Sequence, residues 1–206
     1  MPKAGRTYGP RIPAPNYAQI GKDAERQALK ELGLDRPEDA VHARPEDLIV
    51  KAGDILAQAD AEVALHIDER DQALAHLWFY EQRLGLAKTV GLGNMGYRQA
   101  LATMMFGSKE HVHDLPTGSG EELAQAAEAA GIERVENAEQ KLLKSAQVVH
   151  AARARRDIAL RFMQEAVFAL SQAPYNWTPE KIAEHAGVDR KLIYKRRAAA
   201  RRRHGL

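Results

Sequence analysis

Three glycines spaced as G-x-G-x-x-G form the first pattern in this chain with a known chemistry. They are Gly91, Gly93 and Gly96, in the segment TVGLGNMGYRQ. In dinucleotide-binding enzymes the pattern follows a buried β-strand and lets the backbone approach a pyrophosphate. Here the preceding residues, LWFYEQRLGLAKTV, predict a helix, and the polar segment GSKEHVHDLPTG occupies the place of the second, acid-bearing strand. We therefore expect no dinucleotide site, and a nucleotide-dependent oxidoreductase is a distant alternative.

The other candidate for site chemistry is the cluster HVHD, which contains His111, His113 and Asp114. A His-x-His pair can bind a metal, but this one lies in a polar segment with no cysteine and no obvious further ligand. The chain also lacks a P-loop, a nucleophile elbow and an H-E-x-x-H motif. We expect a solvated loop at HVHD, no metal, no cofactor and no enzymatic activity.

Basic residues concentrate at the ends of the chain. Residues 189–206 carry eight arginines and lysines against one aspartate, a net charge of +7, and residues 1–15 carry +3. The net charge of the whole chain is only +2, so the residues between these ends carry −8. This separation predicts an acidic body whose basic ends bind a polyanion, although a solvated basic tail would have the same composition.

The segment WTPEKIAEHAGVDRKLIYKRRAAARRR predicts the helices that hold the C-terminal basic residues. Thr178, followed by proline, is typical of a helix N-cap. The first helix should end at Gly187, which can adopt the positive φ of a tight turn. Asp189 should cap a second helix with Leu192 and Ile193 facing inward and the basic residues facing outward. The pattern is a helix, a turn and a helix.

This stretch resembles the bacterial and phage helix-turn-helix families, whose motif reads roughly I-A-x-x-x-G-V-S-R-x-x-(I/V)-Y. The matching residues are Ile182, Ala183, Gly187, Val188, Asp189, Arg190, Ile193 and Tyr194. The resemblance covers about the last 50 residues, with RDIALRFMQEAVFAL as the first helix of the same three-helix domain. Arginines stand at 196 and 197, where an apolar residue usually closes the motif. Either Tyr194 and Ala198 complete the core, or the end of the helix is looser.

The resemblance implies that the second helix enters the major groove of DNA. We expect Arg190, Lys191 and Lys195 to lie at or near the bases. The expected phosphate contacts are Thr178, Arg196, Arg197 and Arg201, with Arg202 and Arg203 extending them along the tail.

Three pairs of similar segments indicate an internal duplication. They are GLDRPEDA (33–40) with GIERVENA (131–138), RDQAL (70–74) with RDIAL (156–160), and LAKTVGLGNMGYRQAL (86–101) with IAEHAGVDRKLIYKRR (182–197). The pairs keep the same order in both halves, with offsets of 98, 86 and 96 residues. Each copy would contain a short helix, a turn, a long helix and a compact helical motif. Chance similarity between alanine-rich helices is the alternative.

In the first copy the three glycines acquire a structural interpretation. Gly91 becomes the turn glycine and Gly93 the N-cap, while Gly96 lies inside a helix at a cost of about 1 kcal/mol relative to alanine. The cost indicates a degenerate recognition helix or one whose backbone approaches a partner closely. Its candidate DNA contacts are Asn94, Arg98 and Gln99. We expect weak DNA binding there, or a packing or dimer element.

The sequence as a whole predicts an all-α protein, a tandem repeat of a long helix plus a three-helix helix-turn-helix unit. The expected parts are a flexible basic arm (1–20), unit 1 (21–106), a linker (107–120) and unit 2 (121–206). Arg6 and Arg11 of the arm would enter a minor groove, or the arm would have no role. No stretch of about 18 apolar residues exists, so we expect no membrane span. The absence of cysteine fits a reducing cytoplasm, where we expect the protein at the nucleoid.

The sequence thus favours a sequence-specific protein that binds double-stranded DNA, most simply a transcriptional regulator. One alternative is an architectural or packaging protein that oligomerises on DNA, resembling a phage small terminase subunit. Another is a protein-interaction module that reuses the helix-turn-helix. The long amphipathic helices would pair within the chain or build a homodimer or higher oligomer, and the sequence leaves these open.

Overall fold

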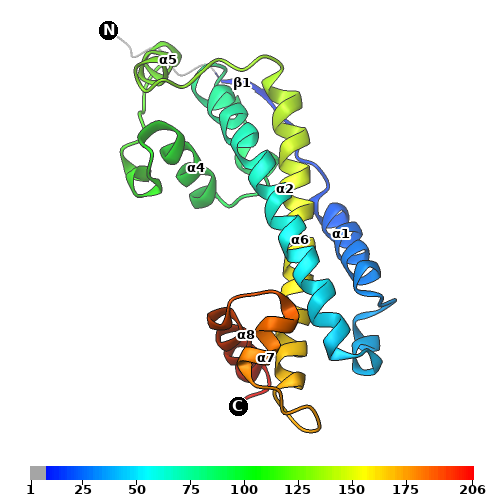
Figure 1. The fold of residues 1–206 in the computed structure, drawn as a ribbon. Coiled ribbons are helices and arrows are strands. Elements are labelled where there is room, and N and C mark those ends of the chain that lie inside the picture. Colours follow the sequence, from blue (N-terminus) through cyan, green and yellow to red (C-terminus); the bar gives the residue numbers. More distant parts are fainter. Residues whose placement is uncertain (1–7) are drawn as a thin grey trace. The chain divides into compact units, whose positions relative to one another are not determined.

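The computed structural model describes residues 8–206, and the chain is mostly helical, with 72% helix and 3% strand (Figure 1). The helices are α1 (Tyr17–Leu32), α2 (Pro45–Phe79), α3 (Leu86–Thr89), α4 (Asn94–Phe106), α5 (Gly120–Ala129), α6 (Ala138–Leu170), α7 (Pro179–Ala186) and α8 (Arg190–Arg203). Two 3-10 helices, η1 (Pro37–His42) and η2 (Lys109–His113), and two strands, β1 (Gly9–Arg11) and β2 (Arg83–Leu84), complete the described elements. The predicted all-α class is confirmed. Along residues 8–206, none of the helices combines the length and apolar character needed to cross a membrane.

The chain forms two compact units whose boundaries fall inside helices. Unit 1 holds the described residues up to Ile20 together with Val63–His150, and unit 2 holds Gly21–Glu62 together with Ala151–Leu206. The long helices α2 and α6 therefore each contribute one half to each unit. This differs from the contiguous units expected from the sequence, because the two halves of each long helix pack into different cores.

Unit 1 is built on the second half of α2 and the first half of α6. Leu77 of α2, Leu101 of α4, Leu123 of α5 and Leu142 of α6 are all fully buried in one core. The segment 107–120, expected as a solvated linker, adds to this core. Val112 in η2 and Leu115 just after it are both buried. These two apolar residues attach the segment to the core. Sequence analysis did not predict this, because the segment is mostly polar.

The N-terminal segment also belongs to unit 1. β1 pairs in parallel with β2, and Ile12 is 1% exposed. Tyr17, at the start of α1, donates a hydrogen bond from its hydroxyl to the Thr89 carbonyl. The flexible arm expected for residues 1–20 is thus wrong for residues 9–20, because one buried isoleucine and a strand pairing hold them. Arg6 lies outside the described residues.

Unit 2 packs α1, the first half of α2 and the second half of α6 around α7 and α8. Its fully buried side chains include Leu32, Ile49, Leu170, Ile182 and Ile193. One cation is buried among them. Arg155 of α6 forms ion pairs of 3.0 Å with Glu31 of α1 and with Glu62 of α2. These pairs join the three helices and compensate the buried charge.

Candidate nucleic-acid interface

The turn between α7 and α8 has the local structure predicted from the sequence. The Thr178 hydroxyl accepts a hydrogen bond from the Lys181 N–H, and α7 begins at the following proline. Gly187 ends α7 with φ +63°, a conformation that favours glycine. The Val188 N–H then donates to the Ala183 carbonyl over 3.0 Å. Asp189 caps α8 by accepting from the Lys191 N–H. The caps and the turn glycine are confirmed.

The inward face of α8 differs from the expected one. Ile193 and Ala200 are buried, two helical turns apart. Leu192 is 37% exposed and Tyr194 is 44% exposed, and Ala198 is exposed as well. Leu192, expected inside, therefore faces outward, because it lies about 100° away from Ile193 around the helix axis. Ala200 closes the core, rather than Tyr194 and Ala198.

Arg196 occupies the inward face between these two buried residues. Its side chain is half-buried, and its Nε has no hydrogen-bond partner among the described residues. Burial, and then the nearby Arg156, lower the pKa of Arg196, while Asp60 opposes them. This placement disfavours the phosphate contact expected for Arg196. The residue lies at the spacing of Ile193 and Ala200 on the helix, which is why an arginine at this position turns inward.

The remaining basic residues of α8 fall into two groups. The first group already has partners: Arg190 pairs with Glu180 at 2.7 Å, Arg203 pairs with Glu165 at 3.2 Å, and the Arg197 guanidinium lies over the Tyr194 ring. The second group is exposed and makes no hydrogen bond or ion pair through its side chains within residues 8–206: Lys191, Lys195, Arg201 and Arg202. Thr178, which was expected to contact phosphate, caps α7 in the structure.

The charge at the start of α8 works against the helix itself. Its first turn carries Arg190 and Lys191 and no acidic residue. A cation near a helix N-terminus opposes the helix dipole at a cost of about 0.3–1 kcal/mol. The Asp189 cap and the Glu180 partner offset part of this cost, and the Arg190 hydrogen bond helps to lower the pKa of Glu180 after a bond from its own backbone. A charge arrangement that destabilises its own helix is typical of functional sites such as binding surfaces.

The turn between α3 and α4 in unit 1 repeats the same backbone geometry. Gly91 has φ +66°, and the Leu92 N–H donates to the Ala87 carbonyl over 3.0 Å. Gly93 is the N-cap of α4, as predicted. A methyl group added at Gly96 would meet only the Leu92 side chain, at 3.8 Å. Glycine at 96 is therefore not required by a close approach within the described chain.

The expected DNA contacts of α4 are less available than those of α8. Asn94 is exposed in the first turn of the helix, whereas Gln99 is half-buried. Arg98 donates to the Val112 carbonyl over 3.2 Å. Arg11, expected in a flexible arm, lies in β1 with an exposed side chain. The structure thus brings Arg11 into the same unit as α4.

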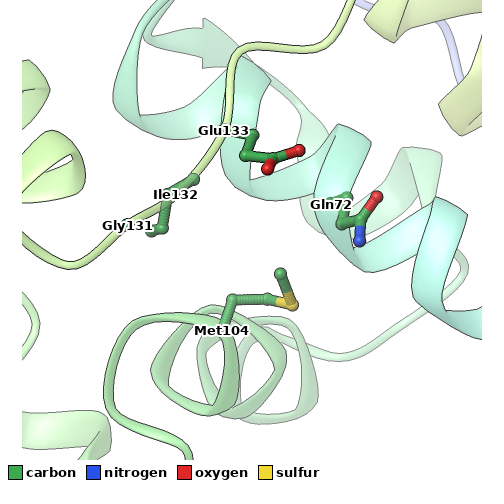
Figure 2. A pocket seen from close by; sticks show the side chains of 5 residues that line it. All are labelled: Gln72, Met104, Gly131, Ile132 and Glu133. Atoms are coloured by element: carbon green, nitrogen blue, oxygen red, sulfur yellow. The ribbon is translucent and has the colours of Figure 1, made fainter.

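The histidine cluster HVHD of the sequence lies at η2 in unit 1. His111 pairs with Asp114 at 2.8 Å, with both side chains exposed. Residues 8–206 contain no group of three histidines, cysteines or carboxylates placed to hold a metal. A cavity of about 250 Å³ lies in unit 1. Figure 2 shows that Met104 of α4 faces Gln72 and Glu133 there, and Glu133 is the one charged residue among the described residues that line it.

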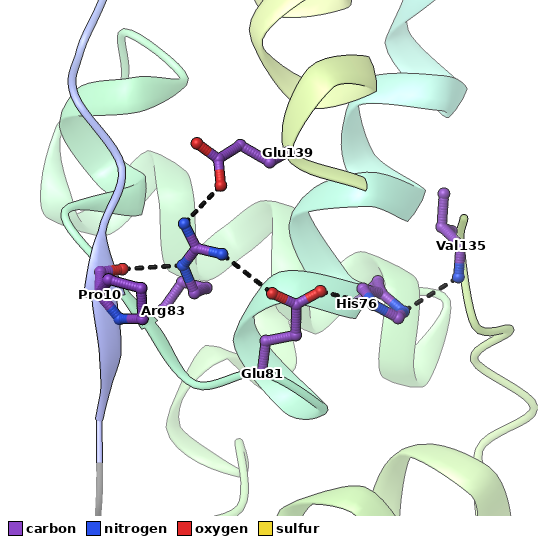
Figure 3. Close-up of polar contacts among 6 residues, drawn as sticks. All are labelled: Pro10, His76, Glu81, Arg83, Val135 and Glu139. Carbon is purple, nitrogen blue, oxygen red and sulfur yellow. Dashed lines mark hydrogen bonds and ion pairs between the residues drawn. The ribbon is translucent and has the colours of Figure 1, made fainter. Parts of the chain in front are cut away.

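A polar network ties the N-terminal strand to the rest of unit 1 (Figure 3). Arg83 donates to the Pro10 carbonyl over 2.8 Å and forms ion pairs with Glu81 and Glu139. The Val135 N–H donates to Nδ1 of the buried His76 over 2.9 Å, so the ring proton lies on Nε2 and is donated to Glu81. Sequence reasoning missed this network, because its members come from three separate stretches of the chain, at residue 10, at 76–83 and at 135–139, and form no motif.

Comparisons of this chain with protein-family models, with curated proteins and with solved structures find no match. Its function is therefore inferred from geometry and charge.

Proposed function

We propose that this protein binds double-stranded DNA in a sequence-specific manner, with α8 as the recognition helix, and that it regulates transcription. The observation that carries the proposal is the group Lys191, Lys195, Arg201 and Arg202, four exposed cations without partners in the described chain. They lie on the second helix of a helix-turn-helix, the element that enters the major groove in proteins of this kind. A polyanion would relieve their mutual repulsion.

The two pairs of cations would have different roles. Lys191 and Lys195 lie in the N-terminal half of α8, where recognition helices contact base edges. Arg201 and Arg202 lie in its last turn and would bind phosphates, which adds affinity without sequence information. Arg190 would exchange its exposed partner Glu180 for DNA, since exposed ion pairs are weak.

We further propose that the chain is a tandem repeat, with copies over residues 21–106 and 121–206. Two equivalent helix ends support this. Gly33 and Gly131, 98 residues apart, have φ of +80° and +73°, and each is followed by an N–H that donates five residues back over 2.9 Å. Gly91 and Gly187, 96 residues apart, share the turn described above. Each compact unit then contains the beginning of one copy and the end of the other.

In a tandem repeat, the long helices can pair within one chain and do not need a second chain. In a dimer of single copies, the beginning of one chain would pack with the end of its partner. Here both contributions come from one polypeptide, which supports pairing of the long helices within the chain. We infer transcriptional regulation because a motif of this kind recognises short DNA sites. Duplication would supply two such motifs of unequal charge.

The direct test is fluorescence anisotropy of labelled duplexes at increasing salt. We expect binding whose logarithm falls linearly with the logarithm of salt concentration, together with discrimination among duplex sequences. Binding without discrimination would replace this proposal with an architectural or packaging role. Absence of duplex binding at low salt would favour a protein-interaction module.

A further inference from the structure

A groove of about 450 Å³ lies in unit 1, beside the α3–α4 motif. Its walls come from the N-terminal segment, the end of α2, the β2–α3 connection and the start of α4. Among the described residues that line it, the charged ones are all basic, and the aromatic ones are Tyr8, Trp78 and Tyr97. A site lined by cations and aromatic rings suits neither a metal ion nor a wholly apolar ligand.

The wall of the groove is held in place before any ligand binds. Arg83 is only 14% exposed, and its bonds to Pro10, Glu81 and Glu139 fix β1 against β2 (Figure 3). The Thr89 hydroxyl adds a hydrogen bond of 3.2 Å to the Ile12 carbonyl. Gly85 lies at the contact with φ +84°, and a Cβ there would lie 3.0 Å from Arg11 Cγ. The close approach of the two segments thus depends on glycine.

Within residues 8–206, the positive charge available to a ligand at the groove comes from Arg11 and Lys88. Arg83 is neutralised by its two carboxylate partners. Arg11 and Lys88 are exposed, and neither side chain forms an ion pair or hydrogen bond within the described chain. They can bind an anion at the groove. Asn94, also in the lining, carries an amide that can donate to and accept from a planar heterocycle.

We propose that this groove binds a nucleotide, with its base stacked against the aromatic side chains and its phosphate bound by Arg11 and Lys88. Stacking of bases on aromatic rings tolerates any base, and Arg and Lys are the usual phosphate ligands. The volume lies within the range of about 300–1,000 Å³ typical of small-molecule sites. The nucleotide is either free in solution or one unit of a nucleic-acid strand, and the chemistry of recognition is the same.

The corresponding positions of unit 2 lack this chemistry. With the 96-residue offset, Lys88 corresponds to Glu184, Tyr97 to Ile193 and Asn94 to Arg190. Unit 2 thus replaces a cation by an acid and an aromatic ring by a buried isoleucine. The groove is a property of unit 1, and its binding does not depend on DNA binding by α8.

The test uses the fluorescence of Trp78. The chain has two tryptophans, so the full-length Trp177→Phe variant leaves Trp78 as the reporter. We expect AMP and TMP to quench this signal with saturation, and inorganic phosphate and adenosine to act at least about 10-fold more weakly, since each offers half of the recognition. Lys88→Gln and Arg11→Gln should each weaken AMP binding about 5- to 10-fold. Lys109→Gln, an exposed lysine outside the lining, should leave it unchanged.

Two results would overturn the proposal: no saturable quenching by either mononucleotide, or equal binding by wild type and the Lys88→Gln and Arg11→Gln variants with unchanged circular dichroism. Phosphate alone binding as tightly as AMP would overturn the stacking of a base. A short oligothymidylate that binds much more tightly than TMP identifies a strand as the source, and equal binding identifies the free nucleotide. Duplex binding through α8 should be the same in all these variants, so failure here leaves the proposed function standing.

Discussion

The α3–α4 and α7–α8 motifs share a turn but differ in almost everything that the turn displays. Both have a glycine at positive φ and the same backbone hydrogen bond after it. Yet α4 contains one charged residue, Arg98, whereas α8 contains eight, all basic. A few backbone requirements therefore define the turn, and the residues on the outer face of the second helix can change without affecting it. Motif geometry alone therefore does not identify a DNA-binding helix, and the charge of the outer face has to be added.

The two motifs also differ in what accompanies them. In unit 1 the N-terminal segment is bonded to the α3 region through Tyr17 and Thr89, and it adds Arg11. In unit 2 the cations lie on α8 itself. We therefore propose DNA recognition for unit 2 and a different ligand for unit 1.

The largest effect is expected from the outward lysines of α8. Lys191→Ala combined with Lys195→Ala should lower affinity for a preferred duplex by about 30-fold or more, because each base contact contributes roughly 1–3 kcal/mol. Competition anisotropy with preferred and unrelated duplexes measures the loss. Met95→Ala with Gln99→Ala, at the corresponding positions of α4, is the control and should cost less than about 3-fold. Equal losses would mean that both helices read DNA.

The next effect concerns phosphate contacts. Arg201→Ala with Arg202→Ala should weaken all duplexes alike, about 10-fold at moderate salt, and reduce the slope of log affinity against log salt by about 1.8. Arg196→Met is the control in the same helix, because the half-buried Arg196 should not reach DNA. A reduced salt slope for Arg196→Met would show that this side chain does bind phosphate.

The third prediction is a gain of duplex binding by α4. Met95→Lys with Gln99→Lys gives α4 lysines at the positions that correspond to Lys191 and Lys195 of α8. We expect duplex affinity to rise about 3- to 5-fold and the salt slope to increase by up to about 1.8, since two more counterions are released. Titrations at several salt concentrations measure both quantities. An unchanged slope would mean that α4 cannot approach DNA.

A stability difference is expected from Tyr17, whose hydroxyl bonds to the α3 region. Tyr17→Phe should lower the free energy of unfolding by about 1 kcal/mol in urea titrations. Burial raises the pKa of Tyr17 from 10.0 to about 12, against the opposing charge of Arg70. The unfolded chain therefore ionises first, and the stability contributed by this group is complete below pH 10 and lost as the pH rises to about 12. An identical alkaline profile for Tyr17→Phe would contradict this assignment.

The smallest effect concerns the exposed pair between Glu180 and Arg190. Glu180→Gln removes an acid beside the DNA face and releases Arg190, so duplex affinity should rise about 2-fold. Glu184→Gln, an exposed acid of the same helix, serves as the comparison. Weaker binding by Glu180→Gln would indicate that the pair positions Arg190 for DNA.

Much of the fold and the interface follows from local sequence signals. Thr178, Gly187 and Asp189 act over a few residues, and each does in the structure what its type predicts. The face of α8 was harder to predict. Arg196 lies inward and Leu192 outward because packing of Ile193 and Ala200 sets the rotation of the helix, and polarity gives the opposite answer.

Long-range features were the ones that the sequence did not reveal. Proline and glycine suggested a flexible arm, but a single buried residue, Ile12, and a strand pairing hold residues 9–20. The groove of unit 1 depends on Arg83 joining segments far apart in sequence. The exchange of helix halves between the units is also invisible to periodicity, because an amphipathic stripe does not specify its partner.

The measurement that tests the central claim most directly is a selection of random duplex DNA at near-physiological salt, with wild type and the Lys191→Ala, Lys195→Ala variant side by side. We expect a compact enriched motif for the wild type that the variant loses, while the variant keeps residual binding at low salt. No enriched motif, or the same motif for both proteins, would contradict the assignment of α8 as the recognition helix.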